Sequence, residues 1–275
     1  MANAPKPSTA KKEKSGGSSI FAGLAIVICI AIAWGLYLFV MGNPANFEGG
    51  DPANHPLPGN YFGMVYKGGI IVPFLMGMFL MVIVFSIERF FVISKAAGNG
   101  NVDAFVKKVQ QFLSSNNVES AISECDKQKG SVAAVIKSGL LKYKEVEMDS
   151  SMDTEQKCLA IQKDIEEATS LEMPMLEQNL TVIATLVSIG TLAGLLGTVV
   201  GMIKAFGALA TSGAPDQAAL ANGISEALIN TATGIGTSTM AIISYNFFTS
   251  KIDSLTYSID EAGFSIVQTY AATHK

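Results

Sequence analysis

Polar side chains that could hold water or an ion are concentrated in one otherwise apolar stretch late in the chain. Residues 226–246 read EALINTATGIGTSTMAIISYN, with six hydroxyl or amide side chains between Asn230 and Thr239. At helical spacing, one stripe of this segment holds Glu226, Asn230, Thr233 and Thr237. A single threonine in such a helix commonly bonds to the backbone of its own preceding turn. A cluster of polar groups is explained better by a wet path through a membrane or by contact with another helix.

Glu226 is the strongest single candidate for a functional residue in this segment. A carboxylate at the centre of a membrane span costs about 3 kcal/mol, and such groups usually face a cavity or a partner. We therefore expect the Glu226 carboxylate to face a cavity or a partner. The alternative is that Glu226 lies at the outer interface of the membrane and is simply hydrated. Glu88 and Lys204 lie nearer to the ends of apolar runs, where interfacial hydration explains them.

The elements that position these side chains are predicted to be membrane helices. Of the 275 residues, only 15% are charged, whereas soluble domains carry about 25%. Charged residues are missing from four gaps, which lie between Lys14 and Glu48, Lys67 and Glu88, Glu177 and Lys204, and Glu226 and Lys251. Each gap holds an apolar run of roughly 18–25 residues, enough to cross a hydrocarbon core about 30 Å thick. The sequence therefore predicts four spans.

The predicted fold is all-α, a polytopic membrane helical bundle with long helices extending into a cytoplasmic helical domain. The predicted segments are a disordered cytoplasmic tail (1–19), an additional N-terminal transmembrane helix (20–41), a periplasmic connection (42–67), a transmembrane helix (68–93), the cytoplasmic helical domain (94–179), two more transmembrane helices (180–208 and 216–250) and a cytoplasmic helical extension (251–275). A signal peptide is the alternative for 20–41. That run is longer than the usual apolar core of about 7–15 residues, so we expect it to be retained.

Local signals predict how the helices of the polar stretch begin and end. Asn101, Asn117 and Ser131 precede apolar residues at helical spacing, as N-cap residues do. The helix before residue 180 is expected to lead directly into the next span, with a kink at Pro174.

Lysine placement predicts the orientation in the membrane. Four lysines precede the first span, namely Lys6, Lys11, Lys12 and Lys14. The connection after that span has Glu48 and Asp51 against Lys67 alone. Later boundaries carry Arg89, Lys95 and Lys251. By the positive-inside rule, both termini and the large polar domain are cytoplasmic.

Small residues in the span at 180–208 predict close helix packing. Gly190, Gly194, Gly197 and Gly201 recur every three or four residues, which lets helix backbones approach each other in lipid.

Other kinds of chemistry find little support in the sequence. Cys29, Cys125 and Cys158 show neither metal-ligand spacing nor even pairing, and His55 and His274 lie outside the apolar runs. The net charge of −4 does not point to nucleic acid. We predict no catalytic residues, no metal and no cofactor.

Three motifs resemble the last two membrane helices of the MotA/TolQ/ExbB proton-channel family, nearest to its ExbB/TolQ branch. They are GLLGTVVGMIKAF at 194–206, ANGISEALINTATGIG at 221–236 and SYNFF at 244–248. IERFF at 87–91 is similar to that branch's first helix boundary. The resemblance does not extend over residues 1–67.

The resemblance implies a ring of subunits, usually a pentamer, in the bacterial inner membrane. Such a ring encloses the single membrane helices of an ExbD- or TolR-like dimer, protons pass at an aspartate of that partner, and a TonB-like protein can be energised. By motif position, Thr198, Glu226 and Thr231 match the family's pore residues. Asn230 and Thr233 are added to the predicted pathway from the helical stripe alone.

Two departures from the family and three alternatives remain open. ExbB and TolQ proteins commonly have three spans, and many relatives carry a proline where this chain has Met240.

An intramembrane enzyme would need a base in mid-span, and a secondary transporter would show internal repeats. A non-conducting scaffold explains the glycines but not the hydroxyl-rich segment. Neither the energised process nor the ion, proton or sodium, follows from the sequence.

Overall fold

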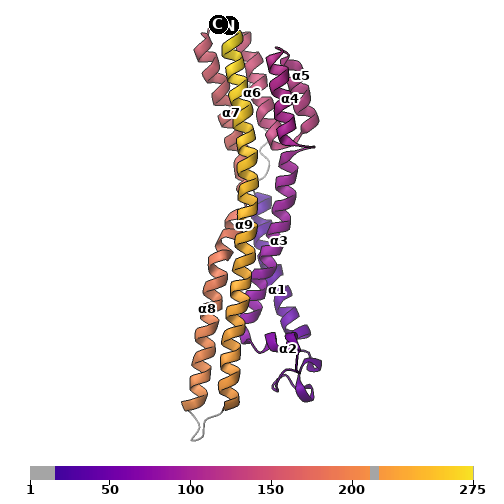
Figure 1. Cartoon of the computed structure of the whole chain (residues 1–275), viewed down its shortest axis with the longest axis vertical. Helices are drawn as coiled ribbons and strands as arrows, with labels where there is room; N and C mark the ends of the chain where they lie inside the picture. The colour runs from indigo at the N-terminus through magenta and orange to yellow at the C-terminus, as the bar shows by residue number, and fades with distance from the viewer. Residues whose placement is uncertain (1–15, 211–216, 275) are drawn as a thin grey trace.

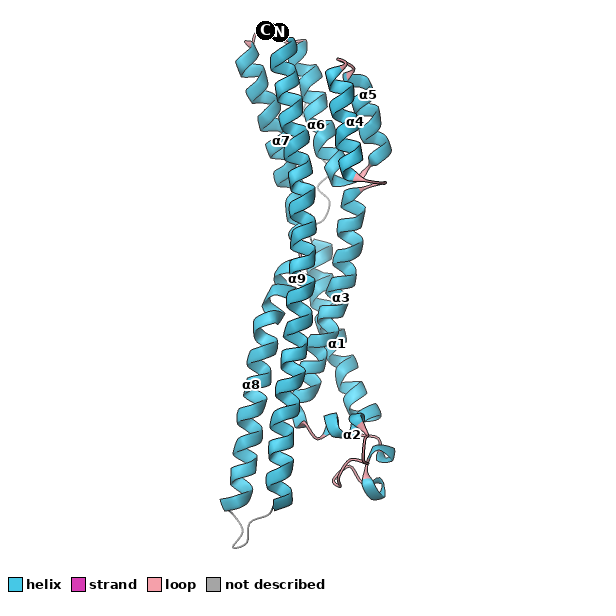
Figure 2. Ribbon diagram, in the orientation of Figure 1, coloured by secondary structure: helices cyan, strands magenta, loops and turns pink. Residues whose placement is uncertain are grey.

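The computed structural model describes residues 16–210 and 217–274, with side chains from residue 22 onward. In chain order the helices are α1 (Gly16–Gly35), a π-helical segment η1 (Leu36–Met41), short 3-10 turns η2 (Pro44–Asn46) and η3 (Glu48–Gly50), α2 (Tyr61–Tyr66), a turn η4 (Gly69–Ile71), α3 (Val72–Ala97), α4 (Val102–Ser114), α5 (Val118–Gln128), α6 (Gly130–Glu147), α7 (Thr154–Glu177), α8 (Leu180–Ala210) and α9 (Gln217–Thr273). They form an elongated molecule with α9 running from end to end (Figures 1 and 2). The described residues contain no strand, so the all-α prediction is confirmed.

Three stretches among the described residues are long and apolar enough to cross a membrane. They are Ala22–Met41, Gly69–Ser114 and Leu180–Ala210. The fourth span predicted, at 216–250, is not in this set, because the start of α9 carries the carboxylate, amide and hydroxyl groups that lower its hydropathy. This part of α9 runs antiparallel to α8 and packs along it (Figure 1). Its polar side chains therefore have a helix as neighbour.

Helix α9 joins two segments that are predicted from the sequence as separate. It is continuous over 57 residues and passes through Met240 without a break. A helix of this length is about 85 Å long, far more than the roughly 30 Å of a hydrocarbon core. The predicted segments 216–250 and 251–275 are thus one element, and its second half packs against α4, α6 and α7.

Helices α4 to α7 and the end of α9 form the helical domain at one end of the molecule (Figure 1). The Asn101 side chain accepts a hydrogen bond from Ala104 N at 3.1 Å, and Asn117 does the same for Ser120 N at 3.0 Å. Both predicted N-caps are therefore confirmed. The cap predicted at Ser131 is wrong, because α6 begins at Gly130, directly after Lys129 in a left-handed conformation (φ +58°).

The helical conformation is interrupted between α7 and α8, four residues after the predicted kink at Pro174. Helix α7 continues through Pro174, and the break falls at Gln178 and Asn179, where Asn179 has φ +62°. A break of this kind leaves carbonyl groups of the last turn without helical donors. The Arg89 guanidinium of α3 supplies them, donating to Met175 O at 3.2 Å and to Leu176 O at 3.0 Å. The kink prediction missed this clamp, which comes from a distant part of the chain.

Replacing Arg89 with methionine is expected to lower the free energy of unfolding by about 3 kcal/mol. Arg89 is fully buried and pairs with Glu88, so the change strands a carboxylate and two carbonyl groups. Unfolding of the purified chain in mixed detergent micelles, followed by circular dichroism, measures the effect. Glu88→Gln is the comparison, since it removes only the partly exposed partner. An Arg89→Met chain as stable as the unmodified one would show that the clamp contributes nothing.

The predicted connection at 42–67 folds over the ends of α1 and α3. The Asn46 amide donates to Val40 O at 2.8 Å and to Met41 O at 2.9 Å, which ties the connection to the end of η1. The predicted disordered tail at 1–19 falls mostly outside the described residues. Helix α1 already begins at Gly16, because serine and glycine are tolerated in a first turn, where N–H groups lack helical acceptors.

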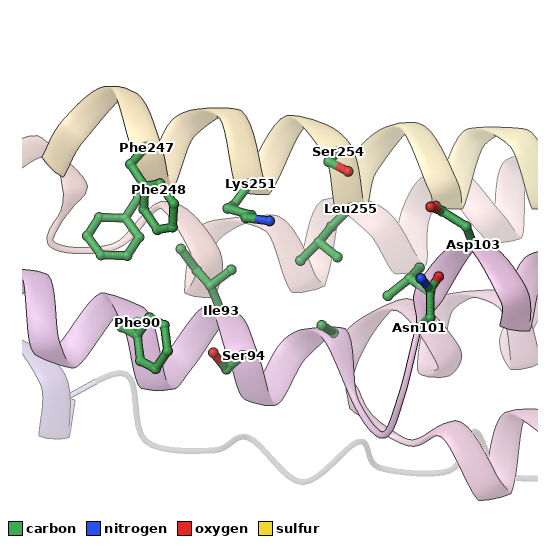
Figure 3. Close-up of a pocket in the computed structure, with 12 residues that line it drawn as sticks. Phe90, Ile93, Ser94, Asn101, Asp103, Phe247, Phe248, Lys251, Ser254 and Leu255 are labelled. Atoms are coloured by element: carbon green, nitrogen blue, oxygen red, sulfur yellow. The ribbon is translucent and has the colours of Figure 1, made fainter. Parts of the chain in front are cut away.

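A cleft of about 380 Å³ lies where α3 ends beside α9 (Figure 3). Phe90 of α3 and Phe247 of α9 gather at one end of the cleft, whereas Asn101 and Asp103 lie at the other. Aromatic rings are enriched at membrane–water boundaries. The boundaries predicted at residues 93 and 250 both fall beside this cleft, and they stay predictions.

Candidate functional site

The site is built on backbone contact between α8 and α9. The predicted packing glycines Gly190, Gly194, Gly197 and Gly201 are all buried on the side of α8 that faces α9. A Cβ at Gly194 would lie 3.0 Å from Gly234 Cα, and a Cβ at Gly201 would lie 2.7 Å from Ala227 N. Both distances are too short for ordinary contact. Glycine therefore lets the two helices approach at these points without displacing each other's backbone.

Thr198 and Thr231 meet across this contact. Their hydroxyl groups are hydrogen-bonded to each other, and Thr231 also donates to Ala227 O at 3.1 Å. Both residues are half-buried, and the neighbouring Leu195 and Leu228 are exposed. The pair thus lies on an edge of the α8–α9 hairpin that remains open in the single subunit.

Glu226 lies nearer to the turn between the helices and is buried, with 8% of its surface exposed. Its Oε1 is 2.5 Å from Nζ of Lys204 on α8. Interfacial hydration alone, as predicted for Lys204 from the sequence, does not account for this pair. Because Lys204 and Glu226 follow the same antiparallel register as Thr198 and Thr231, a hairpin alignment of the two helices could have found it.

The stripe added from helical spacing faces the inside of the subunit. Asn230 is fully buried, and its amide donates to the Gly68 carbonyl at 2.8 Å. No described residue donates to Asn230 Oδ1. Thr233 is half-buried, and its hydroxyl bonds to Ile229 O of its own helix at 2.8 Å. The structure therefore does not place Asn230 on a surface that ions could reach, and Thr233 follows the back-bonding pattern of membrane threonines.

Two titratable groups of the helical domain have shifted pKa values for structural reasons. In the helical domain, burial raises the pKa of the Cys125 thiol to about 12, which keeps it protonated and unreactive. Lys108 and Lys127 hold the pKa of Glu124 below its usual range through hydrogen bonds of 2.8 and 3.1 Å. Within the described ranges, no group of three or more histidine, cysteine or acidic side chains could hold a metal ion.

Fold and site together define a class of protein. The chain is an all-α membrane protein. Its paired helices α8 and α9 are mostly apolar, but they bring hydroxyl groups and a carboxylate close together. The sequence profile of the MotA/TolQ/ExbB proton channel family matches residues 127–261. The chain belongs to this family, and it is similar to members named TolQ and ExbB.

Individual relatives show how far the similarity extends. The Tol-Pal system protein TolQ of Pseudomonas aeruginosa is 30% identical over 155 residues, 56% of this chain and 67% of the relative. A putative biopolymer transport protein ExbB homolog of Methanothermobacter thermautotrophicus is 24% identical over 200 residues, 70% of this chain and 66% of the relative. The biopolymer transport protein ExbB of Xanthomonas campestris pv. campestris is 33% identical over 94 residues, 34% of this chain and 37% of the relative. Helix α1 and the connection after it lie outside the residues that the family profile matches.

Proposed function

We propose that this chain is the ring-forming subunit of a motor in the inner membrane, driven by the proton-motive force. In this proposal several copies surround the membrane helices of an ExbD- or TolR-like partner, and ion flow moves that partner. The process that this motor energises would be TonB-dependent transport across the outer membrane. Both termini and the helical domain would face the cytoplasm.

The observation that carries the proposal is the Thr198–Thr231 hydroxyl pair with Glu226 behind it. Two hydroxyl groups on an otherwise leucine-rich surface are poorly placed against lipid chains. A ring of copies would turn this edge toward a common centre and leave apolar side chains on the outside. Exposed apolar residues of α8 that could serve there are Leu192, Leu196, Val199, Ile203 and Phe206.

The first part of α9 would cross the membrane as the fourth span. It packs along α8 over the length of the apolar helix, so both would occupy the same depth. Its polar groups would then be covered by α8, by α3 and by the centre of the ring. This arrangement explains how a helix of lower hydropathy could be accommodated in a bilayer.

The charged groups of the spans explain why a partner would be needed. Glu226 is already paired with Lys204, and the spans offer no further acid in mid-membrane that could relay a proton alone. A carboxylate on a partner helix would complete the path. Moving one charge through about 100 mV supplies roughly 2.3 kcal/mol, enough to bias a rotation or tilt of the partner.

A non-conducting scaffold is the alternative that uses the same packing. It would need the α8–α9 contact but not the hydroxyl pair. Changing both Thr198 and Thr231 to valine keeps their shape and removes both hydroxyl groups. If the assembled machine keeps its full activity in that double variant, the hydroxyl pair lines no ion path and the scaffold is favoured.

The first test is assembly with a partner. The chain is co-expressed with a single-span protein that carries an aspartate in its membrane helix, and the purified complex is weighed by native mass spectrometry. We expect a closed ring of several copies around fewer partner chains. A monomer or simple dimer that retains no partner, under conditions that keep known relatives intact, would overturn the proposal.

A further inference from the structure

The loop before α3 lies directly on Glu226. Gly68 is buried, and its carbonyl oxygen accepts the Asn230 amide at 2.8 Å. Gly69 has φ +78°, and a Cβ there would collide with the Glu226 carboxylate. A residue with a side chain is thus strained at position 69 by the backbone conformation, and its Cβ would displace the Glu226 carboxylate. The backbone of Gly68 and Gly69 therefore covers one side of the carboxylate, and Lys204 pairs with it from α8.

Tyr66 connects this loop to the N-terminal helix. The rings of Tyr37 and Tyr66 are stacked, with centroids 4.7 Å apart and planes 21° apart. The Tyr37 hydroxyl donates to the Tyr66 carbonyl oxygen at 3.0 Å. Gly68 follows two residues later, and its N–H bonds back to Val65 O at 3.0 Å. In such a tight turn, a shift of the Tyr66 peptide moves the glycines with it.

Tyr37 is itself fixed by the packing of α1 on α3. It is 8% exposed and continues a buried stripe of Ala25, Cys29 and Ala33 at four-residue spacing. Gly77 of α3 gives α1 close access, since a Cβ there would lie 3.3 Å from the side chain of Ile30. The position of Tyr37 along the helix axis is therefore set by the packing of α1 on α3 and not by the connection alone.

We propose that α1, through its continuation η1, positions the Glu226 carboxylate, with Tyr37 of η1 as the positioning residue. Tyr37 holds Tyr66, Tyr66 holds the Gly68–Gly69 turn, and the turn holds Glu226 against Lys204. This gives the additional N-terminal helix a task in the site, although α1 lies outside the residues that the family profile matches. The inference rests on the proposed function for what the carboxylate does, but the chain of contacts stands without it.

The competing explanation is that Tyr37 and Tyr66 only anchor the connection at the membrane surface. Aromatic rings commonly do so. In that case their loss would loosen the chain generally, or leave the site unchanged. A test must therefore compare the cover over Glu226 with a second point on the same helix.

The experiment measures how fast a cysteine at position 226 reacts with a small cationic methanethiosulfonate. Cys29, Cys125 and Cys158 are first replaced with alanine, and Glu226→Cys or Thr231→Cys then provides the single thiol. In the full chain in detergent, Tyr37→Ala is expected to raise the rate at 226 by about tenfold, because stacking and a hydrogen bond are lost. The rate at 231 is expected to change less than about twofold. Tyr37→Phe keeps the stack and should give an intermediate rate at 226.

Phe39→Ala is the matched control, because Phe39 lies in the same segment and is 79% exposed. It is expected to change neither rate. Equal rates at 226 for the Tyr37 and Phe39 variants would overturn the proposal, and so would a rise at both 226 and 231. If Tyr37→Ala does not fold, Tyr37→Phe carries the test by the same criteria. Since no ion flow is measured, failure of this inference and failure of the proposed function are distinguishable.

Discussion

Replacing Glu226 with glutamine is expected to lower ion flow through the assembled protein by about tenfold or more, a rise of at least about 1.4 kcal/mol in the barrier. Glutamine has nearly the same shape, so it fits beneath Gly69, but it carries no charge and takes up no proton at neutral pH. Proton uptake by liposomes that contain the chain with its single-span partner measures the change, with a pH-sensitive dye inside and an imposed potential.

Lys204→Gln is the matched control, because it removes the other charge of the same ion pair and leaves the carboxylate in place. The Lys204 ammonium is a tethered cation at the carboxylate, so ion flow is expected to be maintained or increased without it. Equal losses in both single variants, with recovery in the double variant, would contradict the pathway assignment. That pattern would mean that the pair only holds α8 and α9 together.

The elements that depend on local pattern could be predicted from the sequence. Three of the four apolar runs predicted as spans coincide with stretches that are long and apolar enough to cross a membrane. Side-chain amides before apolar periodicity identified the starts of α4 and α5. The spacing of Gly190, Gly194, Gly197 and Gly201 indicated a close helix contact, and the structure shows them facing α9. These signals are local because each depends on residues within a few turns of one helix.

The parts that could not be predicted depend on contacts between distant segments. The stripe that joins Glu226 to Asn230 was evident, but not that it faces Gly68 and Gly69, more than 150 residues earlier. Periodicity shows which side chains share a face, whereas the neighbour decides whether that face is wet or buried. The same holds at the end of α7, where Arg89 stabilises a break that Pro174 alone would not locate.

The link between the N-terminal helix and the site changes how the family resemblance is applied. Thr198 and Thr231 lie within segments that the resemblance covers, and their contact needs only α8 and α9. Glu226 lies in such a segment too, yet its surroundings include a turn held by Tyr37. A residue can therefore match a family motif while part of its environment comes from outside the residues that the family profile matches. Functional comparisons at Glu226 should include α1, and those at the threonine pair need not.

Replacing Gly234 with alanine is expected to lower the free energy of unfolding by about 1–3 kcal/mol, the usual cost of overpacking. A Cβ at Gly234 would lie 2.6 Å from Gly190 O and 2.7 Å from Gly194 Cα. Both are backbone atoms that cannot turn aside, so α8 and α9 must separate. Unfolding of the full chain by a denaturing detergent, followed by circular dichroism, measures the loss.

Gly236→Ala is the control, since it lies two residues away on α9 and its Cβ would meet nothing within 4 Å. Alanine favours helix over glycine by up to about 1 kcal/mol, so this variant should be as stable as the unmodified chain or more so. Equal stability of the two variants would show that the glycines do not set the distance between the helices. The Thr198–Thr231 contact depends on that distance, because their hydroxyl groups meet only when the backbones touch. A separation large enough to destabilise Gly234→Ala should therefore also break the hydroxyl pair, and ion flow should fall in this variant but not in Gly236→Ala.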